Sequence, residues 1–171
     1  MRRLVKLPLI VVIILTISAL ALAAVKFKKG SPTLTDNGTT LSATGCLTGL
    51  GNTDVQIFLV AEGIPSGTCT NRGQHQPAGI QKKITVTGGT TIPGNEIKNG
   101  TVCFGSPSSR VGTPEPVVEN GCPKPFVFEL NNVEFSFAKL SVVQGNKTVL
   151  EQCYYVNGND SNATFTETAC P

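Results

Sequence analysis

Residues that build common binding and catalytic sites are scarce in this sequence. The chain has no tryptophan, two tyrosines and a single histidine, His75, among 171 residues. Sugar-binding faces use flat aromatic side chains, so this composition disfavours them. Zinc sites need clustered cysteine and histidine, and no two of the six cysteines are close enough for a C-x-x-C pair. We expect no metal site and no cofactor.

Motifs of catalysis and phosphate binding are missing as well. Nucleophilic catalysis needs a base beside the nucleophile, and His75 lies in the polar segment 71–77, which is typical of a surface loop. The segment 63–67 has the wrong spacing for a G-x-S-x-G nucleophile elbow. The segment 49–54 lacks the third glycine of a phosphate-binding loop. The sequence therefore predicts a protein that is not an enzyme.

Acidic residues offer one pair with a possible catalytic spacing. Glu129 and Glu134 stand on either side of Asn131-Asn132 and would meet across a hairpin there, as the two carboxylates of a glycoside hydrolase must. The alternative, which we favour, is that both face solvent on alternating strands. The other acids do not make a calcium site, because the aspartates are isolated and 157–160 is typical of a turn.

The first two dozen residues differ in character from the rest. A cationic start with Arg2, Arg3 and Lys6 precedes an apolar stretch over 7–24 that ends in small residues, the layout of a secretory signal. Removal of residues 1–23 takes away three of the 14 basic residues and none of the 11 acidic ones, so the mature chain is neutral. A neutral chain without a basic stripe is not expected to bind nucleic acid.

The same apolar stretch has a second interpretation. Its 18 residues exceed the usual length of a signal core and approach the roughly 20 residues that span a bilayer. An uncleaved anchor over residues 7–24, with its basic residues inside, would hold the protein on the outer face of the membrane. We favour cleavage and secretion; both alternatives predict export.

All six cysteines lie beyond the leader. An even number of cysteines in an exported chain predicts three disulfides. Six cysteines allow fifteen connectivities, among which sequence alone does not choose. The set that we favour is Cys69–Cys122, Cys153–Cys170 and Cys46–Cys103.

Five Asn-x-Ser/Thr sequons are candidate N-glycosylation sites. They fall at predicted turns and near the C-terminus, where a glycan could be carried in a host that has the pathway. Their acceptor residues are Asn37, Asn99, Asn146, Asn159 and Asn162.

Apolar residues alternate with polar ones over most of the mature chain, and no segment shows helical periodicity over helical length. The strand over 41–47 has one apolar face. The segment 55–61 is apolar on both faces, which predicts a central strand covered on both sides. A strand from Ile84 is expected to end at Gly88-Gly89, and a short one follows the Asn99-Gly100 turn.

The C-terminal half divides into an irregular part and a regular part. Five prolines between 106 and 125 predict a long loop. Alternation resumes at Phe126, and a change of apolar face predicts a β-bulge near 137–139. Gly145-Asn146 is typical of a tight hairpin turn into a strand over 149–156.

Together these elements predict an all-β fold. Seven to nine short strands favour a single antiparallel β-sandwich of the Ig-like or Greek-key type, with a barrel as the alternative and a hydrophobic leader helix before it. The expected organisation is a signal peptide or anchor over 1–23, a linker over 24–37, the sandwich over 38–156, and a tail over 157–171 tied back by a disulfide.

Four motifs carry a resemblance to known proteins: the run from Ala43 to Val55, Thr68-Cys-Thr-Asn71, Glu96-Ile-Lys-Asn-Gly100 and Gly121-Cys-Pro-Lys-Pro125. Over about residues 38–152 the chain resembles a group of small secreted microbial β-sandwich proteins without an assigned function. The resemblance supports the pair Cys69–Cys122, whose members lie in two of these motifs. The chain departs from the group in its other four cysteines and in its C-terminal tail.

The expected role is structural or protein-binding, at or outside the cell surface. Rigid sandwiches present variable loops at their ends, so a partner is expected to contact the loops Ser66–Ile80 and Ser106–Pro125. The alternatives are a small secreted hydrolase that uses Glu129 and Glu134, and a secreted inhibitor or effector.

Intact mass spectrometry of the natural protein tests the export predictions. We expect a mass that lacks residues 1–23 and a gain of two hydrogens for each of three bridges on reduction. Glycans would add mass that a glycosidase removes. A full-length, unchanged mass under both conditions would contradict cleavage and disulfide formation together.

Overall fold

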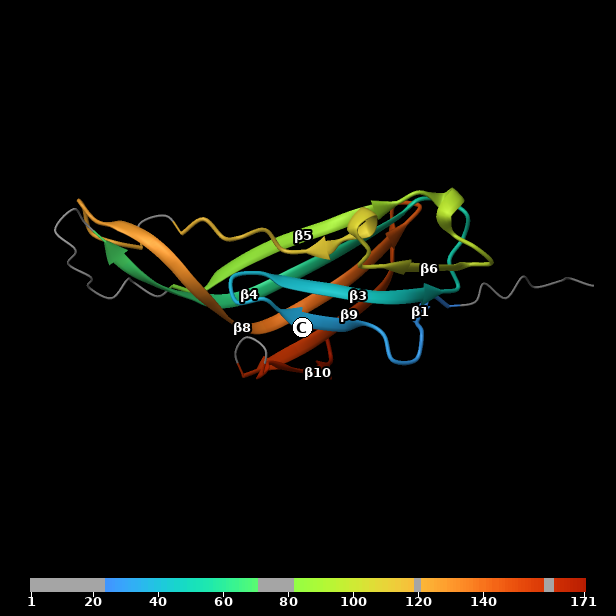
Figure 1. Ribbon diagram of the computed structural model, residues 1–171. Helices are drawn as coiled ribbons and strands as arrows, with labels where there is room; N and C mark the ends of the chain where they lie inside the picture. The colour runs from blue at the N-terminus through green and yellow to red at the C-terminus, as the bar shows by residue number, and fades with distance from the viewer. Residues whose placement is uncertain (1–23, 71–81, 119–120, 159–161) are drawn as a thin grey trace, which may run out of the picture.

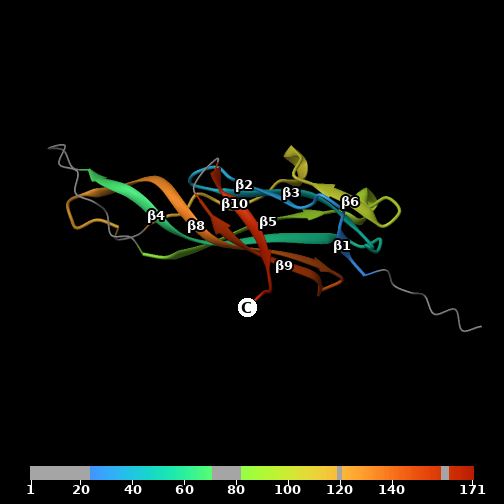
Figure 2. The same cartoon turned by 90° about the horizontal axis from the view of Figure 1, so that it is seen from below.

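The computed structural model of the protein describes residues 24–70, 82–118, 121–158 and 162–171. The predicted leader helix over 1–23 lies outside these residues. The described chain forms ten β-strands and two short 3-10 helices, and the strands make two antiparallel sheets. Figures 1 and 2 show the two sheets as stacked layers. The all-β prediction is confirmed, with the face-to-face arrangement of a β-sandwich.

The larger sheet has five antiparallel strands in the order β10-β9-β8-β4-β5. Two of them are far longer than the short strands expected from sequence: β4 has 16 residues and β8 has 18. Their pairing extends along the whole of β4. The bounds of the five strands, in sheet order, are Thr164–Thr168, Lys147–Asn157, Val127–Gln144, Val55–Thr70 and Ile84–Ile92.

The smaller sheet is built around β3 (Leu41–Thr48). On one side β3 pairs with β1 (Lys26–Phe27) and β2 (Thr33–Asp36); on the other it pairs with β6 (Thr101–Phe104) and β7 (Val111–Gly112). Each edge of the smaller sheet is therefore made of two short strands with a gap between them. The short 3-10 helices η1 (Gly94–Glu96) and η2 (Pro107–Ser109) precede β6 and β7.

Two of the expected boundaries are corrected by these strands. Residues 24–37 are not a linker, because β1 and β2 form one edge of the smaller sheet. The tail over 157–171 contributes β10, which pairs with β9 and is also tied by a disulfide. Strands of two to five residues are too short for alternation to reveal them, and only their partners define them.

Side-chain alternation directs one face of each sheet into a shared core. Leu41, Ala43 and Leu47 of β3 are buried, as predicted. From the larger sheet, β4 and β8 contribute fully buried residues at every second position: Val55, Ile57, Leu59, Ala61, Ala138, Leu140 and Val142.

The opposite face of the larger sheet is not covered by the smaller sheet. Phe58 is 37% exposed and Val60 is half-buried. The prediction that the strand over 55–61 is covered on both sides is therefore wrong. It is central in its sheet but has only one buried face, and the apolar residues on the other face form an open surface.

The two sheets approach closely at Gly88 of β5. A Cβ atom at this position would collide with the carbonyl oxygen of Gly112 in β7. The predicted end of this strand at Gly88-Gly89 is therefore wrong, since β5 continues to Ile92. The glycine is needed for contact between layers, and the backbone remains extended.

Turns and irregularities follow the sequence more closely. Gly145 and Asn146 both have positive φ, 59° and 61°, as a two-residue type I′ hairpin turn requires. Asn99 and Gly100 also have positive φ, and the short strand β6 follows them as predicted. The bulge in β8 lies at Ser136, one residue before the expected range, because Glu62 pairs with Phe137 while Gly63 pairs with Phe135.

Substitution of Gly88 by alanine tests the contact between the sheets. We expect Gly88→Ala to lower the free energy of unfolding by about 2 kcal/mol, because the added methyl group must displace β7. Gly112→Ala is the matched control, since its Cβ would meet only ordinary contacts, the nearest at 3.5 Å. Chemical denaturation of both variants measures the difference, and equal stabilities would contradict this account.

Candidate functional site

The feature that stands out from the sandwich is a two-stranded extension of β4 and β8. Beyond the pair Gly63–Ile84, β4 has no further partner in β5, and beyond Phe137–Tyr155, β8 has none in β9. The two strands continue together at the left of Figure 1. We call this extension, residues 63–70 and 127–135, the ribbon arm.

The sequence of the ribbon arm contains residues that usually interrupt strands. Pro65 is fully buried on the face that continues the core, opposite Val133. A second bulge at Asn131, between the pairs Ser66–Asn132 and Gly67–Leu130, adjusts the register. Because of these irregularities, the alternation in the sequence predicts a strand that ends near Ala61 and does not reveal the arm.

A disulfide and an aromatic ring hold the tip of the arm. Cys69 of β4 is bonded to Cys122 in the segment before β8. Phe128 packs between Gly67 and Gly121, where a Cβ at either glycine would overlap the ring. The segment that contains Gly121 and Cys122 therefore lies against the inner face of the arm.

The base of the arm is attached to the smaller sheet. The backbone N–H of Val133 donates to the carbonyl oxygen of Gly38, in the turn between β2 and β3, at 2.9 Å. The carboxylate of the buried Asp36 accepts from the N–H of Gly38 at 2.9 Å. Both ends of the arm's inner face are thus held by contacts distant in sequence.

Two more disulfides join peripheral segments to the sheets. Cys46 of β3 and Cys103 of β6 lie directly opposite one another in register and are bonded. Cys153 of β9 is bonded to Cys170, beyond the end of β10. The three pairs in the structure are those favoured from the sequence, and the described residues include no free cysteine.

The outer face of the arm is open to solvent. Ile64 is 40% exposed and Val127 is 65% exposed. Glu129 and Glu134 are exposed on the same face, and Glu129 accepts a hydrogen bond from the Thr70 hydroxyl at 2.9 Å. The other side chains of this face are uncharged, so the surface combines apolar and polar groups with two carboxylates and has no basic side chain among its described residues.

The structure excludes the hairpin between Glu129 and Glu134, which was the alternative not favoured from the sequence. Residues 131 and 132 lie within the continuous strand β8, so both glutamates belong to one strand and pair with Thr68 and Ile64 of β4. At about 3.3 Å per residue their backbones are roughly 15 Å apart. The favoured interpretation, that both glutamates face solvent where polar and apolar side chains alternate, is confirmed.

The two loops expected to contact a partner are brought together at the arm. Residues 66–70 of the first belong to β4, and the rest of that loop, with His75, lies outside the described residues. Residues 111–113 of the second pack on the sandwich, where Thr113 accepts from the N–H of Leu41. The disulfide Cys69–Cys122 joins the two at the tip.

Four of the five sequon asparagines are described, and all four are exposed: Asn37, Asn99, Asn146 and Asn162. Asn159 lies outside the described residues. The Asn37 amide donates to the Ser42 hydroxyl at 3.1 Å and to backbone carbonyls nearby. The side chains of the other three asparagines make no comparable hydrogen bond within the described part of the chain. Asn99 and Asn146 stand at turns with positive φ.

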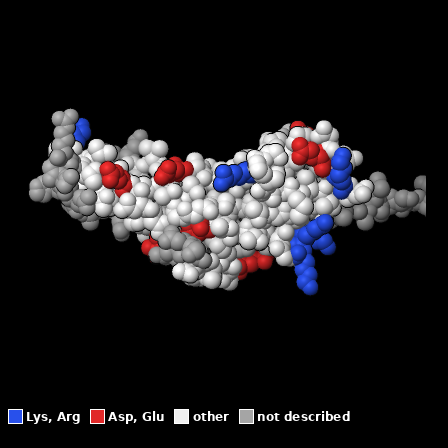
Figure 3. Space-filling view, in the orientation of Figure 1, with Lys and Arg blue, Asp and Glu red and all other residues white. Residues whose placement is uncertain are grey.

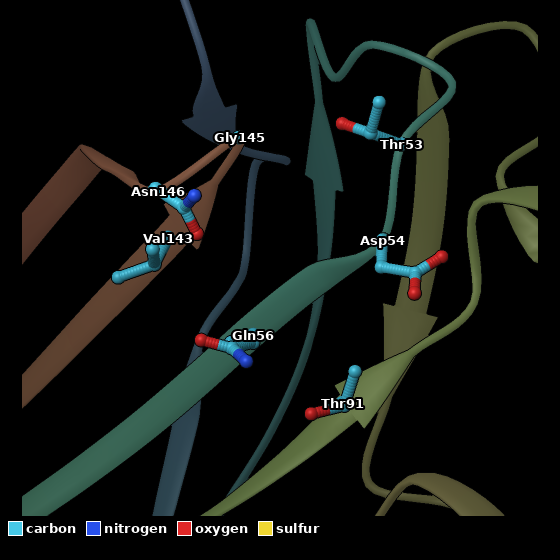
Figure 4. Close-up of a pocket in the computed structure, with 7 residues that line it drawn as sticks. All are labelled: Thr53, Asp54, Gln56, Thr91, Val143, Gly145 and Asn146. Carbon is cyan, nitrogen blue, oxygen red and sulfur yellow. The ribbon is translucent and has the colours of Figure 1, made fainter.

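A polar pocket lies at the end of the sandwich far from the arm. Figure 4 shows Asp54 and Gln56 from the start of β4, Thr91 from β5 and Asn146 from the β8–β9 turn around it. Its volume is about 480 Å³. Asp54 accepts from the N–H of Gly94 at 2.9 Å and is the one ionisable group in the lining. Most of the residues that line it carry polar side chains, whereas pockets for organic ligands are usually lined mainly by apolar ones.

Charge is sparse over the described surface. Figure 3 shows few acidic or basic residues on the face in view, with a basic group beside β1 and an acidic residue next to a basic one near the right end. No group of three or more histidine, cysteine, aspartate or glutamate side chains able to hold a metal ion occurs in the described part of the chain. The ribbon arm is therefore the feature with the most distinctive geometry.

One titratable group in the core has a perturbed pKa. Burial of Tyr154 raises the pKa of its phenol above the ordinary range, and the charge of Glu167 raises it further. The Tyr154 hydroxyl is buried and has no hydrogen-bond partner among the described residues. Tyr155, the next residue, is 58% exposed on the other face of β9.

Alkaline unfolding tests this difference between the two tyrosines. The unfolded chain loses the phenolic proton near pH 10 and the folded chain only at higher pH, so the contribution of Tyr154 is present below pH 10 and is lost as the pH rises above it. We expect Tyr154→Phe to keep stability at neutral pH and to reduce its loss above pH 10. Tyr155→Phe is the control, and equal effects in denaturation at both pH values would contradict the assignment.

Comparisons with known proteins add no assignment. No helix in the described part of the chain is long and apolar enough to cross a membrane. No protein-family model matches the sequence, and a search of curated proteins finds no match. The geometry of the fold is therefore the basis for a functional proposal.

Proposed function

We propose that the protein is exported and binds a protein partner at or outside the cell surface, with the ribbon arm as its binding element. The observation that carries this proposal is the projection of the arm beyond both neighbouring strands while a disulfide holds its tip. A pre-ordered element loses little conformational entropy on binding. The inner face of the arm is buried, whereas its outer face is open to solvent and available to a partner.

The three disulfides support the compartment. Such bonds persist in oxidising environments and are rare in reducing ones. All three join segments far apart along the chain, with sequence separations of 57, 53 and 17 residues. A leader that is cleaved and one that remains as an anchor would both present the arm to the outside.

The surface of the arm indicates the chemistry of the partner. Exposed Ile64 and Val127 offer apolar contact, and Glu129 and Glu134 offer negative charge on the same face. A complementary surface would combine an apolar patch with lysine or arginine side chains. The resemblance to small secreted microbial β-sandwich proteins is compatible with this role and names no partner.

Binding of purified protein to the surface of the producing cells tests the proposal. We expect Glu134→Lys and Ile64→Asp each to weaken saturable binding about tenfold, because each removes a complementary contact. Glu167→Lys, which makes the same charge change on the β10 edge of the sandwich, is the control and should bind like the unaltered protein. Circular dichroism checks that each variant is folded.

The proposal fails if the unaltered protein shows no saturable binding, or if the arm variants bind as well as the control. Removal of the disulfide supplies a further measurement. Cys69→Ser/Cys122→Ser keeps the surface chemistry but loosens the tip, so affinity should fall while the sandwich, held by two other disulfides, remains folded.

A further inference from the structure

Strand β5 is an open edge of the larger sheet. It is the last strand in the order β10-β9-β8-β4-β5, and its nine residues pair with β4 on one side only among the described residues. In a strand paired on one side, about half of the backbone N–H and C=O groups point away from the partner. Such an edge is a ready template for another strand.

The other three sheet edges are short or interrupted. One edge of the smaller sheet is divided between β1 and β2, and the other between β6 and β7, each strand having two to four residues. The edge strand β10 has five residues, includes the exposed Glu167, and ends beside a disulfide. These are devices that prevent strands from adding to an edge.

None of these devices is present in β5. The strand, Ile84-Thr-Val-Thr-Gly-Gly-Thr-Thr-Ile92, contains no charged residue and no proline, and its pairing with β4 has no bulge. Threonine, valine and isoleucine are favourable strand residues. We propose that β5 pairs with β5 of a second copy of this chain, in antiparallel orientation across a two-fold axis. This inference is independent of the partner proposed for the ribbon arm.

The sequence of β5 is nearly symmetric about Gly88. An antiparallel pair centred there opposes all nine residues, with Ile84 against Ile92 of the partner subunit and Thr85 against Thr91 of the partner subunit. Cross-strand threonine pairs stabilise antiparallel sheets. Residues directly opposite one another share a face, so this register also keeps the core faces of both copies on the same side.

Charge is compatible with the same orientation. Of the two exposed lysines that precede β5, Lys83 pairs with Glu62 of its own copy at 2.5 Å, while Lys82 remains at the start of the strand. Asp54 and Glu96 lie near the other end of β5, together with the exposed Lys98. The fit of a second copy therefore rests on the hydrogen-bonding edge and on the symmetric sequence of β5.

A pair of nine-residue strands buries less surface than a stable dimer interface, so we expect weak, concentration-dependent association. Sedimentation of the full protein should show dimers that increase with concentration. Thr87→Lys, which places two positive charges near the two-fold axis, should lower the dimer association constant at least tenfold. Thr166→Lys makes the same change on the β10 edge and should have no effect. Equal effects of the two substitutions would overturn the proposal.

Cysteine crosslinking tests the register. Opposed Cα atoms in antiparallel strands are about 4.5–5.5 Å apart, which suits a disulfide. A mixture of Thr85→Cys and Thr91→Cys proteins should form covalent dimers under mild oxidation. Each variant alone should not, because like positions are about 20 Å apart in this register. Both side chains are exposed on the outer face, so the fold should be retained.

Mass mapping of the bridged peptides identifies the new bond and shows that the three native disulfides are intact. Crosslinking in the mixture alone supports the proposal. Equal crosslinking in the single-variant samples, or a monomer in every sample at about 1 mM protein, overturns it. A dimer that Thr87→Lys leaves unchanged would place the interface elsewhere and also overturns it.

Discussion

The antiparallel pairing of β4 with β8 is the constraint on which the rest of the structure depends. Within the sandwich this pair carries the centre of the five-stranded sheet and much of its buried face. Beyond the sandwich the same pair continues as the ribbon arm. Because one register governs both regions, the bulges at Ser136 and Asn131 decide which side chains face the core and which face solvent.

Peripheral segments are held to this pair by covalent bonds. The three disulfides close loops with sequence separations of 57, 53 and 17 residues. Each contributes on the order of 3–4 kcal/mol to the free energy of unfolding by restricting the unfolded chain, which is a large share of the net stability of a small domain. Their positions are informative as well, since they join the two sheet edges and the arm tip to their neighbours. The edge strand β5 has no such reinforcement.

Much of the fold follows from local sequence signals. Alternation identified the core face of β3 and much of that of β8, and Gly145-Asn146 identified the hairpin turn by its need for positive φ. Strand lengths did not follow, because Pro65 and the glycines around it were interpreted as breakers. They lie on the arm's inner face, where Pro65 is buried and a side chain at either neighbouring glycine would collide with Val133 or Phe128. The candidate site was therefore visible in sequence only as two separate loops.

The sequence by itself determined the all-β class, several turn positions and the set of six cysteines, because composition, periodicity and backbone preference are local properties. Only the tertiary structure decided that β1 and β2 complete a sheet, that one face of the larger sheet is open, and that Glu129 and Glu134 lie along one strand. Those facts depend on which strands become neighbours. That choice is set by packing between residues far apart in the chain, which no local pattern records.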